Sequence, residues 1–282
     1  MPSSLIDMIN YYQEFRELYF EILNDFGFDY ERDLEARDVL LEIMQQKVKN
    51  TSYNLESVLL SFQATLRSRK NIFIYGCGPS LEDTVEHVLE KYGIEIFQNS
   101  INLAADGASL FLREREIPIT AIFSDLDGIT RNEFSHSDYM VIHGHGDNIE
   151  RLENFKDKMQ GFHNVIGTTQ VEPLGVIINP GGFTDGDRIL YFLRTLIFPE
   201  NNLFLIGMDF KSVIGKYSKP EMNKNQEGSP IKQKKLGYAI KLLEWLHPRL
   251  PSKIYFVNTD QISNKFCYLS IEEFVNMVLY ER

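Results

Sequence analysis

The sequence predicts an α/β fold: an open, mostly parallel Rossmann-like sheet with helices on both faces. From Asn71 onward, short β-branched and aromatic runs such as Ile72–Tyr75 and Ile119–Phe123 alternate with helical segments. Strands that are apolar throughout are typical of a parallel sheet covered on both faces. Right-handed crossovers would then place ligands outside the carboxyl ends of the strands, where this chain carries glycines and aspartates.

Residues 1–68 are predicted to form a helical segment that precedes an α/β catalytic domain of residues 69–282. Apolar residues recur there at helical spacing, beginning with Leu5, Met8, Ile9 and Tyr12. The pattern shows no catalytic chemistry, so we expect a helical cap or a homo-oligomerisation element. Farther along, residues 216–235 are polar and lysine-rich, which predicts a long lid-like loop before a helix at Leu236–Leu246.

Composition narrows the range of partners. The chain has 282 residues, 43% of them hydrophobic, and 29 basic against 40 acidic residues give a net charge of −11. An acidic balance argues against nucleic-acid and membrane partners, which need a basic surface. Cys77 and Cys267 fit neither a disulfide framework nor a zinc motif, and no apolar run reaches membrane-spanning length. We therefore expect a cytoplasmic protein.

Two acidic segments follow predicted strands. Asp125 and Asp127 lie two residues apart after Ile119–Phe123, so they can share one Mg²⁺ on the same side of the chain. Asp106 and Gly107 follow Ala104-Ala105, whose small side chains leave room for a ribose or a flat ring. Turn chemistry with solvated carboxylates is the alternative for both segments.

A third acidic segment opens a predicted helix after a glycine pair. Asp185 and Asp187 repeat the spacing of two and are flanked by Gly182, Thr184 and Arg188. Helix capping by Thr184 or Asp185 is a good alternative interpretation. A phosphate, ribose or metal contact would use Arg188 as well, and we expect Asp185 or Asp187 to assist the metal.

Histidines and glycine-rich turns supply further candidates. His143, His145, Asp147 and Asn148 suit ligand contact better than zinc binding, and His145 is a candidate for phosphate contact or for accepting a proton. The remaining candidates for ATP or substrate binding are the turn after the first strand, a polar strand end and two lysines: Gly76, Gly78, Ser80, Thr168, Thr169, Gln170, Lys216 and Lys235.

Taken in order, these segments resemble the archaeal 6-hydroxymethyl-7,8-dihydropterin pyrophosphokinase family (MptE-like). The motifs that carry the resemblance are Gly76–Leu81, Ala104–Ala108, Ser124–Gly128, His143–Asn148, Gly167–Gln170, Gly182–Arg188 and Gly207–Phe210. The N-terminal Asp25–Phe28 also resembles that family, so the likeness covers nearly the whole chain. Three motifs are similar to thiamin pyrophosphokinase as well.

The resemblance implies that ATP and Mg²⁺ serve the transfer of a diphosphoryl group to a hydroxymethyl pterin, with release of AMP. It implies Mg²⁺ at Asp125 and Asp127, and nucleotide or metal contact at Asp185 and Asp187. A transferase with a nucleotide-sugar donor (glycosyltransferase-like), a thiamin-type pyrophosphokinase and a noncatalytic nucleotide-binding module are the alternatives.

Overall fold

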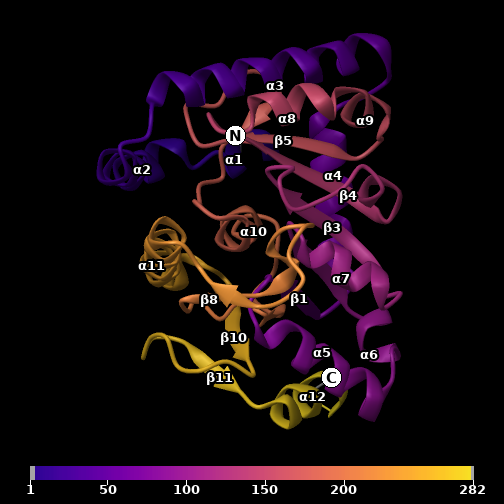
Figure 1. Cartoon of the computed structure of the whole chain (residues 1–282). Coiled ribbons are helices and arrows are strands. Elements are labelled where there is room, and N and C mark those ends of the chain that lie inside the picture. The colour runs from indigo at the N-terminus through magenta and orange to yellow at the C-terminus, as the bar shows by residue number, and fades with distance from the viewer. Residues whose placement is uncertain (1–3, 281–282) are drawn as a thin grey trace.

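A nine-stranded parallel sheet forms the centre of the molecule (Figure 1), which confirms the expected fold class. The structure, a computed structural model, describes residues 4–280. In spatial order the strands are β11 (Cys267–Leu269), β10 (Lys253–Val257), β7 (Asn202–Ile206), β1 (Asn71–Tyr75), β2 (Ile101–Ala105), β3 (Ile119–Ser124), β4 (Ser137–Gly144), β5 (Val165–Thr169) and β6 (Ile177–Ile178).

The order of the strands reverses between β1 and β7. From β1 the chain proceeds strand by strand to β6, and it then returns to β7 on the other side of β1. Right-handed crossovers therefore place α5 (Ser80–Tyr92), α6 (Glu95–Gln98), α7 (Ala108–Glu114), α8 (Ile149–Asn154) and α9 (Lys156–Gly161) on one face. The opposite face carries α10 (Asp185–Leu193) and α11 (Pro230–Leu246). This reversal creates a crevice at the carboxyl ends of β1 and β7.

The N-terminal helices pack on the same hydrophobic core as the sheet. They are α1 (Leu5–Ile9), α2 (Tyr12–Phe26), α3 (Tyr30–Asn50) and α4 (Leu55–Arg67). In Figure 1, α3 lies beside α8 and α9. On the sheet, the aromatic ring of Phe62 in α4 stacks on Tyr139 of β4 at 4.5 Å between centroids. The expected boundary near residue 68 falls between α4 and β1, and a division into two domains stays a prediction.

The segment before α11 differs from the expected loop. It contains the antiparallel pair β8 (Val213–Ile214) and β9 (Gln226–Glu227), and α11 begins at Pro230 rather than at Leu236. The earlier start follows from the cap, because the Ser229 hydroxyl accepts a hydrogen bond from Lys232 N and proline suits a first helical turn. The last helix, α12 (Ile271–Tyr280), packs against α5 and β11.

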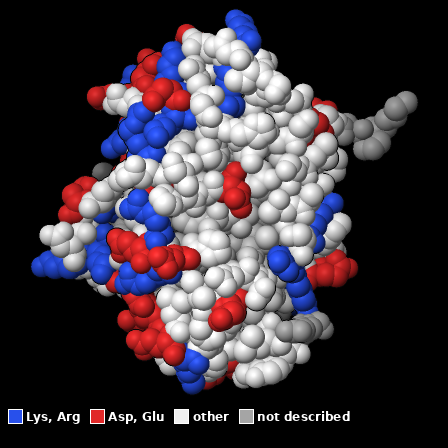
Figure 2. Space-filling model, turned by 90° about the vertical axis from the view of Figure 1, so that its right-hand side faces the viewer, with Lys and Arg blue, Asp and Glu red and all other residues white. Residues whose placement is uncertain are grey.

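Charged side chains are distributed unevenly over the surface. On the face shown in Figure 2, acidic and basic side chains are intermixed along one edge, and much of the centre is uncharged. Within residues 4–280, no helix is long and apolar enough to cross a membrane. Cys77 and Cys267 are free thiols.

Candidate active site

A cavity of about 860 Å³ opens at the carboxyl-terminal edge of the sheet. Its walls come from the loops after β2, β3, β4 and β5, from α10 and α11, and from the start of α3. Parallel strands present their carboxyl ends on one side, and for this reason segments far apart in the sequence meet here.

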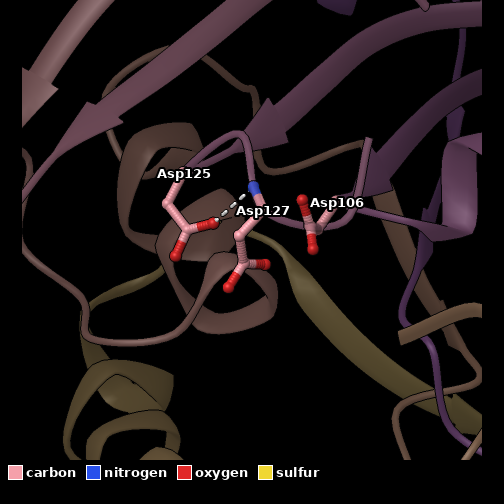
Figure 3. A group of neighbouring side chains, drawn as sticks. All are labelled: Asp106, Asp125 and Asp127. Carbon is pink, nitrogen blue, oxygen red and sulfur yellow. Dashed lines mark hydrogen bonds between the residues drawn. The ribbon is translucent and has the colours of Figure 1, made fainter. Parts of the chain in front are cut away.

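Three carboxylates gather in this cavity. Asp106 follows β2, Asp125 and Asp127 follow β3, and one oxygen of each lies within 4.8 Å of the others. Figure 3 shows the three side chains pointing into the same space. Leu126, with a φ of 73°, turns the chain between the two β3 aspartates, and Asp127 N donates to Asp125 Oδ1 at 3.2 Å. The pair was expected, whereas the sequence had assigned Asp106 to substrate contact.

Asp106 is buried and held firmly. Its Oδ1 accepts hydrogen bonds from Ser124 Oγ at 2.6 Å and from Gly128 N at 3.1 Å. Burial, followed by the negative charges of Asp185, Asp125 and Asp127, raises the pKa of Asp106 well above its ordinary value. Clustered carboxylate oxygens are the ligands that Mg²⁺ prefers, and a cation would relieve their mutual repulsion. The residues present therefore fit a divalent cation.

His145 supports the triad through Asp125. Its Nε2 lies 3.0 Å from Asp125 Oδ2, and its Nδ1 accepts a hydrogen bond from Asp147 N at 3.3 Å. An accepting Nδ1 places the proton on Nε2, so Nε2 donates to the carboxylate. Burial alone would raise the pKa of Asp125, but the hydrogen bond from His145 and the positive charges of Arg188 and Lys219 lower it below its ordinary range. His145 thus positions Asp125.

The other residues of the β4 and β5 ends serve mainly as internal supports. The side-chain amide of Asn148 donates to Asp125 O at 2.8 Å and to His143 O at 2.7 Å. His143 is buried and contacts Thr168 Oγ1 through Nδ1 at 3.0 Å, and Thr169 Oγ1 accepts from Val171 N. Asp147 and Gln170 line the cavity, and their contact with ATP or substrate stays a prediction.

The start of α10 contributes one charged pair and one cap. Asp185 and Arg188 line the cavity and pair at 3.2 Å. Burial, and then the charge of Asp125, raises the pKa of Asp185 to about 7. Asp187 is fully buried and accepts hydrogen bonds from Phe183 N at 2.6 Å and from Thr184 N at 3.0 Å. Asp187 is thus the N3 residue of a capping box whose N-cap is Thr184, one of the two residues that the alternative interpretation named.

Gly182 has a φ of 90°, and a Cβ there would overlap Arg188. Glycine therefore lets the loop before α10 pass close to this arginine. The metal role predicted for Asp185 and the catalytic role predicted for Asp187 stay predictions.

Basic side chains face the triad across the cavity. Lys219, in the segment between β8 and β9, forms an ion pair with Asp127. Lys235 in α11 is half-buried, and burial, with Lys232 and Arg188 nearby, lowers its pKa. Such a concentration of positive charge favours an anionic ligand. Lys216, which the sequence also proposed, pairs with Glu82 at 2.6 Å and lies outside the residues that line the cavity.

The segment that carries Lys219 packs closely on the site. Tyr217 contacts Phe111 in a tilted arrangement at 5.1 Å between ring centroids, and its hydroxyl donates to Glu114 Oε2 at 2.7 Å. A Cβ on Gly107 would overlap the carbonyl oxygen of Tyr217. Gly107 thus allows this segment to approach the β2 end.

The turn after β1 meets a carboxylate of the chain itself. Asp209 follows β7, and its Oδ2 accepts a hydrogen bond from Ser80 N at 3.0 Å at the start of α5. A Cβ on Gly78 would overlap this carboxylate, and one on Gly76 would overlap Met208. Gly76 and Gly78 line a second, smaller cavity beside the first. Sequence reasoning placed a phosphate or a carboxylate at this helix start and did not single out Asp209.

The N-terminal helices also reach the cavity, which sequence reasoning missed. Phe28, Asp29, Arg32 and Asp33 line it, and Asp33 Oδ1 accepts from Gly146 N at 2.7 Å. The available signal was a charged residue on the apolar side of a helix. Asp33 lies three and seven residues before the buried Ala36 and Leu40.

Comparison with known proteins places the chain among related enzymes. Residues 45–215 match the family model described as 6-hydroxymethylpterin diphosphokinase MptE-like. The chain is 34% identical over 245 residues to the 6-hydroxymethyl-7,8-dihydropterin pyrophosphokinase of Pyrococcus furiosus, covering 86% of this chain and 97% of that protein. It is 33% identical to the protein of the same name from Methanocaldococcus jannaschii, covering 84% and 96%.

A solved structure shows a weaker likeness. The MAf glycosyltransferase from Magnetospirillum magneticum AMB-1 aligns with a TM-score of 0.41 and 17% identity, over 72% of this chain and 34% of that one. This similarity is too low to support a shared function. The family match and the two archaeal relatives are decisive, and the chain belongs to the MptE-like family of 6-hydroxymethylpterin diphosphokinases.

Proposed function

We propose that this protein is a 6-hydroxymethyl-7,8-dihydropterin pyrophosphokinase that uses ATP and Mg²⁺ and releases AMP. The names of the relatives supply the reaction and the pterin. The observation that carries the nucleotide and the metal is the acidic triad opposite a basic wall. The triad consists of Asp106, Asp125 and Asp127, and the basic wall includes Lys219 and Lys235.

In this reaction the pterin hydroxyl oxygen bonds to the β-phosphorus of ATP. The bond from that phosphorus to the AMP oxygen breaks, and the hydroxyl proton is released. The triad would hold Mg²⁺, which neutralises phosphate oxygens when bound. Arg188, Lys219 and Lys235 would bind and orient the phosphates, since phosphoryl transfer depends mainly on position and charge. The segment of residues 213–229 would limit the access of water.

Product analysis tests this proposal. The protein is incubated with ATP, Mg²⁺ and 6-hydroxymethyl-7,8-dihydropterin, and nucleotides and pterins are separated by chromatography. We expect one AMP for each diphosphorylated pterin formed. Formation of ADP, or no consumption of ATP, contradicts the proposal. Thiamin in place of the pterin is the matched control, and faster turnover with thiamin would overturn the acceptor assignment.

A further inference from the structure

The second cavity lies at the crevice where the strand order reverses. Its volume is about 110 Å³, and its walls include the ends of β1 and β7. Asp106, Thr184, Asp185 and Lys232 line both cavities. A ligand in each cavity would therefore meet the other beside the acidic triad, as two reacting substrates must.

The two cavities differ in size and in the number of basic residues that line them. Apart from the shared Lys232, the large cavity is lined by the basic residues Arg32, Arg188, Lys219, Lys224 and Lys235, whereas the small one has Lys211. A nucleoside triphosphate is a large polyanion and matches the first set. The small cavity is left for a compact ring without formal charge.

Asp209 gives the small cavity a specific chemistry. The side chain is 7% exposed and lines this cavity, and the next residue, Phe210, has a φ of 50°. Positive φ in a non-glycine residue stores strain, which is typical of functional sites. Asp209 Oδ2 accepts a hydrogen bond from Ser80 N, and the Ser80 side chain also acts on this carboxylate. An ionised carboxylate has about four acceptor positions. Acceptor capacity is thus left for a ligand.

We propose that the small cavity binds the aminopyrimidine half of the acceptor pterin, with the rest of the ring extending towards the shared wall, and that Asp209 accepts hydrogen bonds from the aminopyrimidine edge. The assignment rests on the proposed function. The 2-amino group and the neighbouring ring N–H of a pterin are two adjacent donors, which match a carboxylate. The hydroxymethyl group is at the opposite end of the bicyclic ring. Anchoring the amino end at Asp209 directs that group towards the shared wall at Asp106 and Asp185.

Burial raises the pKa of Asp209 in the absence of ligand. Two N–H donors from a bound ring would stabilise the charged form and offset that cost. Pterin binding at this position thus supplies the compensation that a buried carboxylate needs.

The variant Asp209→Asn tests the assignment. Its amide oxygen can still accept from Ser80 N, so we expect the unfolding midpoint to change little. Its NH₂ group would face the donors of the pterin. We expect KM for the pterin to rise about 100-fold or more and KM for ATP to stay within about twofold. Asp157→Asn, at an exposed carboxylate paired with Arg131 outside both cavities, is the control with unchanged constants.

A ring analogue provides a second measurement that needs no variant. The wild-type protein should discriminate strongly against the pterin in which oxygen replaces the 2-amino group, and Asp209→Asn should reduce that discrimination. Equal KM values for both rings in the wild type, or a variant impaired for ATP alone, overturn the assignment while leaving the proposed function intact. A wild-type protein that forms no diphosphorylated pterin overturns the proposed function itself.

Discussion

Asp33 in α3 accepts a hydrogen bond from the backbone N–H of Gly146, 113 residues farther along the chain, at 2.7 Å. Its second oxygen accepts from the Tyr19 hydroxyl at 2.6 Å and from Gln170 Nε2 at 2.7 Å. The Asp33 carboxylate thus connects α2 and α3 with the ends of β4 and β5. It also holds the loop whose His145 contacts Asp125.

Replacing Asp33 with Ala should therefore lower both the free energy of unfolding and the rate of turnover. The change leaves three donors without their acceptor in a buried site, and each unsatisfied group costs about 1–3 kcal/mol. We expect the free energy of unfolding to fall by at least about 3 kcal/mol in urea titrations. Asp38→Ala on the same helix should change it by less than about 0.5 kcal/mol, because Asp38 is exposed. Equal effects of the two changes would contradict the bracing role.

The mutual repulsion of the three carboxylates in the triad should destabilise the folded protein when no cation is bound. Asp106→Asn keeps an oxygen for Ser124 and Gly128 but removes a negative charge, so we expect the metal-free variant to gain about 1 kcal/mol of stability at pH 8. Turnover should fall at least about 100-fold.

Mg²⁺ at ten times its dissociation constant should stabilise the wild type by about 1.4 kcal/mol and the variant much less. Thermal unfolding with and without Mg²⁺ measures this, and Asp157→Asn is the surface control.

The sequence predicted the parallel sheet and the Asp125–Asp127 pair because both depend on local patterns. Apolar runs define strands, and a spacing of two places both carboxylates after one strand. The sequence placed Asp106 at the same edge of the sheet but not in contact with this pair, because its approach depends on the β2–β3 neighbourhood and on Asp106 itself taking a φ of 49°. The contribution of Asp33 was hidden for a similar reason, since it requires the packing of α3 against the β4 end.

Lys219 is expected to affect metal binding and turnover in opposite directions. Its ammonium pairs with Asp127 and so competes with a cation for that carboxylate. Lys219→Gln should therefore bind Mn²⁺ several-fold more tightly without nucleotide, while kcat/KM for ATP falls about tenfold or more because a phosphate contact is lost. Titration calorimetry and steady-state kinetics measure the two effects. Lys241→Gln, which removes a cation over the Tyr238 ring in α11, is the matched control. Loss of both metal affinity and turnover would contradict this competition.

His143 should make the protein less stable in acid. Burial, followed by the positive charge of Arg188, lowers the pKa of His143 well below 6.5 in the folded state. Below about pH 6.5 the unfolded chain binds a proton that the folded protein does not. The free energy of unfolding therefore decreases as pH falls, by up to about 1.4 kcal/mol per pH unit. Urea titrations between pH 7 and pH 5 should show a shallower decrease for His143→Gln, whereas His136→Gln, at an exposed position, should keep the wild-type slope. Identical slopes for the wild type and His143→Gln would show that His143 takes up a proton in the folded protein.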